Sequence, residues 1–516
     1  MREYHLNYTK DRLAAPLPIW RAHVDRDQWV ATAGEIASRG GRLVSLWSVE
    51  RGAGTPVRGV CAAYAGDAGL LWVELESTDD SPTYPDLTQS FACANRMQRA
   101  VADLSDMHAE AAPDTRPWLD HGLWGINAHP LRHGPLDPPV STGEGSGAYP
   151  FVRVAGDGVH EIAVGPVHAG IIEPGHFRFS VVGEKVLRLE EHLGYTHKGI
   201  ERRFLDLPPM TAHRLAGRVS GDSTVAYCWA YCMALESVCD VEVPDRARWL
   251  RALMLERERV ANHLGDLGAL GNDAALAFGL AQFSRLREDW HRLSCEVFGH
   301  RFMMDAIEPG GLARDVGPAA LDRLRSQCDA VGREVRALRL IYDDHAGLQD
   351  RFIGAGRVTP ELAARLGLTG LAGRASGQVG DLRCDQPWEP YRQLGARRCT
   401  RQEGDVAARV AVRFDEVFES LRLQHELCAN APAGRVRHSL TLPAQAAAGA
   451  GWIEAWRGEV FVALEIDSEG RIVRCHCHDP SWQNWPVLEH AIIGNIVPDF
   501  PLINKSFNLS YSGHDL

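Results

Sequence analysis

The sequence predicts an α+β protein: a small α/β domain, residues 1–132, followed by a mainly α-helical bundle domain, residues 151–516, flanked by small β-sheets. Two observations support this division. The stretch HGPLDPPVSTGEGSGAYP at 133–150 is rich in Pro, Gly and Ser, a composition typical of a linker. The spacing of apolar residues also changes, from strand-like runs early in the chain to long helical stripes after residue 243. A chain of 516 residues is also too long for one ordinary domain.

The first part mixes strand and helix signals. RLVSLWSVE at 42–50 and GLLWVELES at 69–77 are apolar, β-branched and aromatic runs that predict strands. The segment FACANRMQRAVADLSDMHAEAA at 91–112 has a helical pattern. Together they indicate a small α/β domain.

The second part begins with strand runs at 151–166 and 176–192 and continues with helices. Pro244 predicts the start of a long helix, because proline is favoured in the first turn. Its apolar stripe consists of Leu250, Leu253, Val260, Leu264 and Leu267. Similar stripes at 321–338 and 410–421 predict the core of a bundle. The run EVFVALEIDSEGRIVRCHC at 459–477 predicts a β-hairpin.

Composition and charge exclude some classes of function. The net charge is −12 and the chain has no basic run, so we expect no nucleic-acid partner. The N-terminus, MREYHLNYTKDR, lacks the apolar core of a signal peptide. The longest strongly apolar run, 225–235, is well short of the ~20 residues of a spanning helix. We therefore expect a cytoplasmic protein that reaches a membrane only through partners.

The twelve cysteines show no C-x-x-C pair, so the sequence predicts neither a zinc site nor an iron–sulfur cluster on this chain. Cys228 and Cys232 are four residues apart on one apolar helix, which favours core packing. The stretch Cys475-His476-Cys477-His478 alternates and places its cysteines and histidines on opposite faces of a strand. That alternation favours a structural strand over a metal site.

Five segments of the second part carry a family resemblance. They are GPVHAGIIEPGHFRF (165–179), GEKVLRLEEHLGYTHKGIE (183–201), ERERVANHLGDLGALGND (256–273), GLTGLAGRASG (367–377) and WQNWPVLEHAIIGNIVPDFPLI (482–503). In this order they resemble the superfamily that joins the large subunit of group 4 membrane-bound [NiFe] hydrogenases, of formate-hydrogenlyase type, to the 49 kDa subunit of complex I. EPGHFR and GNIVPDFPLI are more similar to the hydrogenase branch. MQRAVADL (97–104) and GINAHPLR (125–132) resemble the 30 kDa subunit of complex I, which is fused to the large subunit in formate-hydrogenlyase enzymes.

The resemblance also identifies a degenerate metal site. In the hydrogenases, two C-x-x-C pairs hold nickel and iron, and these positions correspond here to Ser220 and Ser223, and to Ser510 and Gly513. Hydroxyls are poor ligands for metals that prefer soft thiolates, and glycine offers no side chain. We therefore expect no nickel–iron centre and no cofactor on this chain. The chain stops at Leu516, so we also expect no C-terminal extension that is cleaved after nickel insertion.

Two other interpretations of the stretch Ser220-Gly221-Asp222-Ser223 stay open. Ser220 is a suitable N-cap for the helix at 225–235. Alternatively, five side chains together provide ligands for a hard cation or water: Asp222, Ser220, Ser223, Ser510 and His514.

The resemblance to complex I raises the question of quinone. The positions of its quinone-binding His and Tyr fall at about Pro174 and Gly221, and neither can bind a headgroup through its side chain. His168 and His176 lie close to the first position, so quinone binding stays an alternative. No G-x-G-x-x-G follows a strand, so NAD binding is not expected.

Further pocket residues follow from the resemblance. Glu173 matches a glutamate proposed to pass protons from the metal, and Arg457 matches an arginine that overhangs the metal site. With His176, these residues form a candidate proton relay. A structural ion pair between a buried Glu and a buried Arg is the competing explanation. Other residues in matching motifs are His176, His197, Glu201 and Arg374, and we expect His263 to be a satisfied core histidine.

The resemblance implies a nickel-free, hydrogenase-like large subunit of a membrane-bound, complex I-like complex, attached to the cytoplasmic face of the membrane. The implied partners are a small subunit carrying a [4Fe–4S] cluster, ferredoxin-like subunits and antiporter-like membrane subunits. Its role would be to couple electron transfer to ion translocation. One alternative is an active oxidoreductase, either a quinone reductase or a hydrogenase with atypical ligands. The other is a non-catalytic scaffold.

Overall fold

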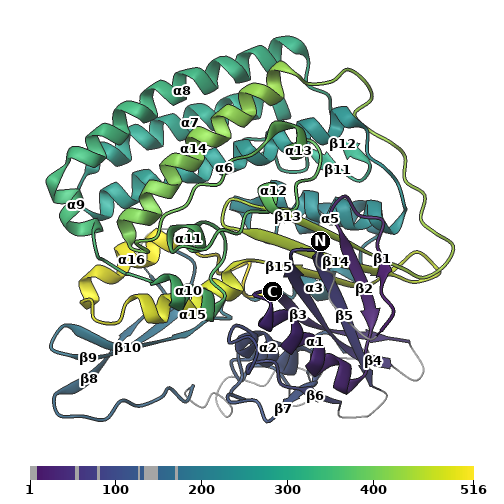
Figure 1. Ribbon diagram of the computed structural model, residues 1–516, viewed down its shortest axis with the longest axis horizontal. Coiled ribbons are helices and arrows are strands. Elements are labelled where there is room, and N and C mark those ends of the chain that lie inside the picture. The colour runs from purple at the N-terminus through teal and green to yellow at the C-terminus, as the bar shows by residue number, and fades with distance from the viewer. Residues whose placement is uncertain (1–7, 53–56, 78–81, 126–127, 133–148, 169–171) are drawn as a thin grey trace.

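Long helices occupy one end of the molecule and small sheets the other (Figure 1). The computed structural model describes residues 8–52, 57–77, 82–125, 128–132, 149–168 and 172–516. Nearly all of the expected linker at 133–150 lies outside these residues, as do Ile126 and Asn127 of the second 30 kDa-like motif. The position of the domain boundary therefore stays a prediction, whereas the α+β fold class is confirmed.

The N-terminal part contains a five-stranded sheet in the order β1-β2-β5-β4-β3. Its strands are β1 (Asp11–Arg12), β2 (Ile19–His23), β3 (Arg42–Arg51), β4 (Val57–Gly66) and β5 (Gly69–Ser77). β2 pairs with β5 in parallel and the other neighbours are antiparallel. β3 and β5 confirm the two predicted strands.

Two helices cover one face of this sheet. They are α1 (Arg26–Ser38), which begins with a capping box between Asp25 and Gln28, and α2 (Ala94–Ser105). The helix expected over 91–112 forms only over Ala94–Ser105. It ends there because Asp106 adopts a left-handed conformation with φ 56°. The chain then forms β7 (His108–Glu110), which pairs in parallel with β6 (Thr83–Pro85).

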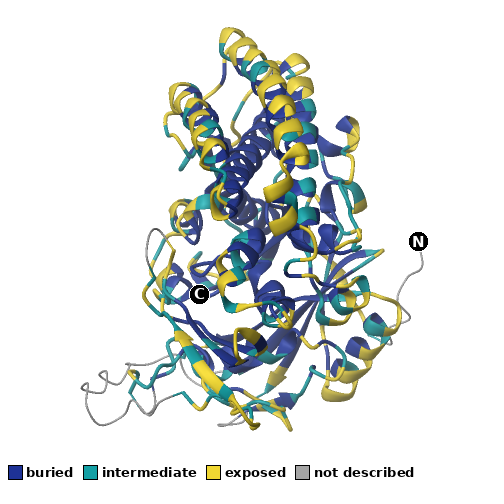
Figure 2. Cartoon of the chain, turned by 90° about the vertical axis from the view of Figure 1, so that its left-hand side faces the viewer, coloured by how far each residue is buried: buried dark blue, intermediate teal, exposed yellow. Residues whose placement is uncertain are grey.

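The helical part is built around four long helices, which Figure 1 shows side by side in its upper half. They are α6 (Asp245–Asp273), α7 (Ala277–Phe298), α8 (Pro318–Asp344) and α14 (Val406–Ala429). The three predicted stripes are buried in α6, α8 and α14, and Figure 2 shows the buried faces turned inward. α7 was not among the predicted helices. Shorter helices are α3 (Ile200–Phe204), α4 (Pro209–Ala216), α9 (Ala346–Phe352), α10 (Pro360–Leu366), α11 (Gly370–Ala375), α12 (Leu382–Asp385), α13 (Tyr391–Leu394), α15 (Ser481–Ala491) and α16 (Phe500–Phe507).

Two three-stranded antiparallel sheets accompany the bundle. One contains β8 (Val159–Val164), β9 (His176–Val182) and β10 (Lys185–His192), and the other β13 (Ala447–Glu454), β14 (Glu459–Ile466) and β15 (Ile472–His478). A two-stranded ribbon pairs β11 (Ile307–Glu308) with β12 (Gly311–Leu312). The buried helix α5 (Thr224–Val238) packs directly on β13. Gly451 permits this approach, because a Cβ there would lie 1.9 Å from the carbonyl oxygen of Ala230.

The second face of the N-terminal sheet packs against β14 and β15, so both of its faces are buried. Trp47 lies in one apolar cluster with Phe461 and stacks on His476 with ring centres 4.7 Å apart. Ser45 Oγ lies 2.6 Å from Nε2 of His476, whose Nδ1 lies 2.6 Å from Oε1 of Glu201. The adjoining cavity of about 30 Å³ is large enough for a water molecule but not for a substrate. We therefore regard this Ser–His–Glu chain as a contact between the two parts.

The stretch at 475–478 is the structural strand that its alternation predicts, and all twelve cysteines are free.

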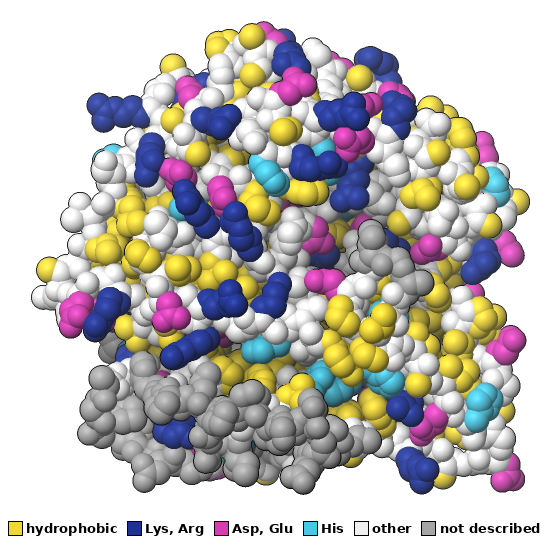
Figure 3. Space-filling model, turned by 180° about the vertical axis from the view of Figure 1, so that it is seen from behind, with side chains coloured by type: hydrophobic (Ala, Val, Ile, Leu, Met, Phe, Trp, Pro, Cys, Tyr) yellow, Lys and Arg dark blue, Asp and Glu magenta, His cyan; other side chains and the backbone are white. Residues whose placement is uncertain are grey.

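On the face seen from behind, basic and acidic side chains are interspersed with apolar ones (Figure 3). Within the described part of the chain, no helix combines the length and the apolar character needed to cross a membrane.

Candidate functional site

The four degenerate ligand positions converge at the N-terminal end of α5. Ser220 Oγ lies 3.0 Å from Ser510 Oγ, although the two residues are 290 positions apart in the sequence. The backbone N–H of Gly513 donates to Ser510 Oγ at 2.8 Å. Ser223 is the last residue of the short helix η1 (Gly221–Ser223), and its hydroxyl oxygen lies 3.1 Å from Nε1 of Trp456. The fold therefore brings together the positions that the resemblance selected.

A guanidinium group lies among these positions. Arg457 forms a two-pronged ion pair with the carboxylate of Asp222, which also accepts a hydrogen bond from Ser220 at 2.6 Å. Nε of Arg457 donates to the carbonyl oxygen of Asn508 at 2.5 Å, and the guanidinium lies over the ring of Trp456. Burial alone would raise the pKa of Asp222, but Arg457 and Ser220 hold it below its ordinary value. Asp222 is therefore ionised and paired at neutral pH.

The expectation that Ser220 caps the following helix is wrong. Neither Ser220 nor Ser223 makes a side-chain capping bond. Instead, the carboxyl group of Glu258 on α6 accepts from the backbone N–H groups of Val225 at 2.7 Å and Ala226 at 3.2 Å. Burial raises the pKa of Glu258 to about 8. A neighbouring helix thus caps α5, and the Ser220 hydroxyl is free to contact Asp222 and Ser510.

These residues do not fit a nickel–iron centre. The hydroxyls are hard, weak ligands, and the Arg457 cation already binds the one carboxylate among them. Gly513 has no room for a side chain, because a Cβ there would lie 2.6 Å from Oδ2 of Asp479. The same ion pair disfavours a hard cation, and His514 binds Asp515 through Nδ1 at 2.8 Å.

A different group of potential ligands lies in the N-terminal sheet. Within the described ranges, His23, Glu74 and Glu76 alone bring three such side chains close together. Glu74 is already paired with Arg21 and Arg51, so this group also lacks a free buried carboxylate.

The three residues of the candidate relay lie apart from one another. Glu173 is exposed and accepts from the backbone N–H of Ser512 at 3.3 Å. His176, on β9, contacts the carbonyl oxygen of Gly165 and accepts from Arg178, and burial lowers its pKa. Neither side chain contacts Arg457 among the hydrogen bonds and ion pairs of the described residues. The ion pair expected between a buried Glu and Arg457 forms instead with Asp222, and the relay stays a prediction.

The remaining motif residues have structural partners. Glu201 pairs with Arg474 at 2.7 Å and with His476; burial opposes its ionisation, but these partners lower its pKa to about 2. His197 Nδ1 lies 3.2 Å from the carbonyl oxygen of Asp515. His263 is fully buried, as expected for a core histidine, and its Nε2 lies 2.9 Å from Glu416. Its buried Nδ1 has no hydrogen-bond partner among the described residues, so the expectation that this histidine is satisfied is confirmed for one ring nitrogen only.

Four further residues belong to the site but were missed. Asn262 donates to the carbonyl oxygen of Asp222 at 2.7 Å, and the hydroxyl of Tyr227 donates to Asp479 at 2.8 Å. Trp456 donates to the carbonyl oxygen of Asp222 at 3.0 Å. The sequence signal for Asn262 was its position one turn after Glu258 on α6. No pattern in the sequence indicates Asp479.

A small α/β domain joined to a helical bundle, with ligand positions at the start of a buried helix and near the C-terminus, defines a class of oxidoreductase large subunit. Residues 22–136 match the family of the 30 kDa subunit of respiratory-chain NADH dehydrogenase, and residues 270–448 match that of its 49 kDa subunit. Formate hydrogenlyase subunit 5 of Escherichia coli (strain K12) is 30% identical over 454 residues, covering 86% of this chain and 79% of the relative. Hydrogenase-4 component G of the same organism is 31% identical over 442 residues, covering 84% and 76%.

A solved structure shows the same fold. The structure of the membrane-bound sulfane sulfur reductase (MBS), an archaeal respiratory membrane complex, includes a chain with a TM-score of 0.65 and 24% identity, covering 69% of this chain and 98% of that one. The protein belongs to the family of hydrogenase large subunits and complex I 49 kDa subunits, in the form fused to a 30 kDa-like domain. Members of this family are subunits of complex I-like or hydrogenase-related respiratory complexes.

Proposed function

We propose that this chain is a nickel-free, hydrogenase-like large subunit that couples electron transfer in a partner to ion translocation. The observation that carries the proposal is the ion pair between Asp222 and Arg457, set among hydroxyls that hydrogen-bond to each other. A pocket that holds its own cation has no need of a metal to balance its charge. Soft-metal ligands are absent at all four family positions.

The relatives support a place in a larger assembly. Their names refer to formate hydrogenlyase, hydrogenase-4 and NADH-quinone oxidoreductase, all of which have several subunits or components. The proposed partners are an iron–sulfur small subunit with a [4Fe–4S] cluster, ferredoxin-like subunits and antiporter-like membrane subunits. The chain would lie on the cytoplasmic face of the membrane and attach through these partners.

The site could transmit a mechanical change. Arg457 lies in the turn between β13 and β14, Asp222 precedes α5, and Asn508 ends α16. One guanidinium therefore ties together a sheet, a buried helix and the C-terminal segment. A shift in any of these elements that broke the pair would leave the buried Arg457 guanidinium without its carboxylate partner, which is unfavourable. Such a pair favours two discrete arrangements over gradual movement.

Metal content tests the proposal. The complex is purified from cells with an active nickel-insertion pathway, then assayed for nickel by mass spectrometry and for hydrogen uptake. We expect no stoichiometric nickel, no hydrogen uptake, and only the iron explained by partner clusters. Nickel at one atom per chain together with hydrogen uptake would refute the proposal and establish a new ligand set.

A scaffold without chemistry is the second candidate, because Glu173 is exposed and, among the described residues, forms no hydrogen bond or ion pair with Arg457. Glu173→Gln and Arg457→Lys separate the two candidates, with Glu184→Gln and Arg357→Lys as controls at exposed positions. Loss of ion translocation in Arg457→Lys, with assembly intact and both controls normal, supports coupling. Normal translocation in both test variants would support the scaffold.

A further inference from the structure

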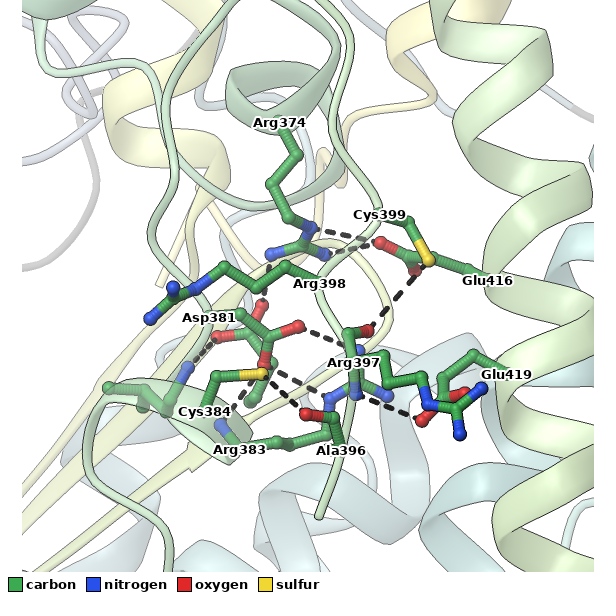
Figure 4. Close-up of polar contacts among 12 residues, drawn as sticks. Arg374, Asp381, Arg383, Cys384, Ala396, Arg397, Arg398, Cys399, Glu416 and Glu419 are labelled. Carbon is green, nitrogen blue, oxygen red and sulfur yellow. Dashed lines mark hydrogen bonds and ion pairs between the residues drawn. The ribbon is translucent and has the colours of Figure 1, made fainter.

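A continuous network of buried charges connects α6, α11, α12, α14 and the end of β13. Figure 4 shows its part around Arg374, Glu416, Asp381 and Arg383. Arg374 binds Glu416 at 2.7 Å and Glu454 at 2.8 Å. The chain of contacts continues from Glu416 to Arg259 and from there through Glu256 and Arg383 to Asp381. No side chain in it is more than 4% exposed.

The charges of this network do not balance. It contains three guanidinium groups (Arg259, Arg374, Arg383) and four carboxyl groups (Glu256, Asp381, Glu416, Glu454), with His263 hydrogen-bonded to Glu416. If every carboxyl group were ionised and His263 neutral, the network would carry one uncompensated negative charge in a region without solvent. Such a charge is strongly disfavoured, and a group neutralises by binding a proton instead.

The geometry selects one carboxyl group. Glu416 contacts Arg374, Arg259 and His263, and Glu256 contacts two arginines and accepts from Tyr391 and Ser420. Asp381 forms a two-pronged contact with Arg383. Glu454 has one guanidinium partner, which it shares with Glu416, and within the described part of the chain it otherwise accepts only from the backbone N–H of Leu382 at 3.1 Å. Glu454 is therefore the least stabilised anion of the four.

We propose that Glu454 is a buried proton-binding site, protonated at neutral pH, which makes the network electrically neutral. The charged groups that face it are Arg374 from α11, Asp381 and Arg383 from the α12 segment, and Arg259 from α6. Arg42 from β3 also faces it but is paired with Glu459.

The direction of two pKa shifts agrees with this assignment. Burial has the largest effect and raises the pKa of Glu454. Arg374 opposes this shift, and the negative charge of Asp381 adds to it. The pKa of Asp381 itself is lowered to about 2 by Arg383 and Arg374, against the effect of burial. Two nearby carboxyl groups thus have their pKa values pushed apart, as happens when one of a pair keeps its proton.

The site lies next to the element that the proposed function depends on. Glu454 precedes Arg457 by three residues, and Arg259 donates to the carbonyl oxygens of Glu454 and Ala455 at 2.8 and 3.0 Å. Loss of the proton would make Glu454 an anion and strengthen its attraction to Arg374. That force would act on the turn that positions Arg457 beside Asp222. This consequence rests on the proposed coupling role, whereas the proton-binding site itself does not.

Infrared spectroscopy of the full chain tests the site. The spectrum of Glu454→Gln is subtracted from that of the wild type at pH 7, with Glu236→Gln as the control because Glu236 is similarly buried but paired with Arg251. We expect Glu454→Gln to lose one C=O band of a protonated carboxyl group and Glu236→Gln to lose none. If that band persists in Glu454→Gln, the proton lies elsewhere and the assignment fails.

Stability gives a second readout. Because the folded-state pKa of Glu454 is raised, the wild type should lose stability relative to Glu454→Gln as the pH rises through that pKa. A difference between the two proteins that stays constant with pH would also overturn the assignment. Nickel analysis plays no part in either measurement, so the proton site and the proposed function can fail independently.

Discussion

Replacing Arg457 by methionine should loosen the C-terminal segment. Methionine keeps the apolar stem of the side chain but removes the ion pair with Asp222 and the bond to the carbonyl oxygen of Asn508. A hydrogen bond from a charged group contributes about 1.5–3 kcal/mol, and breaking a fully buried pair costs about 3–5 kcal/mol. The Asp222 side chain is 33% exposed, which reduces the second effect. We therefore expect a loss of about 2 kcal/mol in local stability, inside the first range and below the second.

Hydrogen exchange measures this loss at defined amides. The N–H of Ser510 is bonded to Ser481 Oγ and that of Gly513 to Ser510 Oγ, so both are protected while the segment stays in place. A loss of about 2 kcal/mol corresponds to roughly thirtyfold faster exchange, since 1.4 kcal/mol is a factor of ten. Local exchange is the appropriate assay because a chain with several parts does not unfold in two states.

A matched variant defines the refuting result. Arg351 is 42% exposed and contacts Asp499 at 3.5 Å, so Arg351→Met should leave both amides unchanged. If Arg457→Met also leaves their exchange within twofold of the wild type, the pair does not hold the segment in place. The mechanical role argued for Arg457 would then be untenable.

Three further outcomes follow from the packing and the charges. Gly451→Ala should destabilise the chain by about 1–3 kcal/mol or prevent folding, because its Cβ would collide with the carbonyl oxygen of Ala230; denaturant unfolding measures this. The pKa of Glu201 is lowered to about 2 in the folded state, so its ion pairs stabilise the fold fully above its unfolded pKa. This stabilisation is lost as the pH falls towards 2. Glu201→Gln should reduce this acid dependence when unfolding is measured over a series of pH values. Asp25→Ala removes the capping box of α1 and should cost about 1 kcal/mol, detectable as faster exchange in its first turn.

The regular elements could be predicted because their signals are local. The strand at 69–77 matches β5 (Gly69–Ser77), and the apolar stripes of α6, α8 and α14 repeat with helical spacing. The apolar residues of α7 are separated by many exposed ones, and its stripe was not recognised. The helix expected to run to residue 112 stopped early because Asp106 takes a left-handed conformation that no periodicity reveals.

The position of the site could be predicted, but the pairing of its side chains could not. Family motifs located Ser220, Ser510 and Arg457, and the fold brings them together. The pairing of Arg457 with Asp222 spans 235 positions, and the cap of α5 comes from Glu258 on another helix. Contacts of this kind depend on tertiary packing, which neither propensity nor spacing in the sequence records.

The N-terminal sheet has no face left for solvent. α1 and α2 cover one side, and Trp47 and Trp72 on the other belong to the same apolar cluster as Phe461. A fragment ending at residue 132 would expose those tryptophans to water, and the fragment from 151 onward would lose the wall that covers β14 and β15. Neither half should be soluble by itself, whereas the two halves produced together should reassemble without a covalent connection. The two parts therefore depend on each other as the subunits of an obligate heterodimer do, although they belong to one chain.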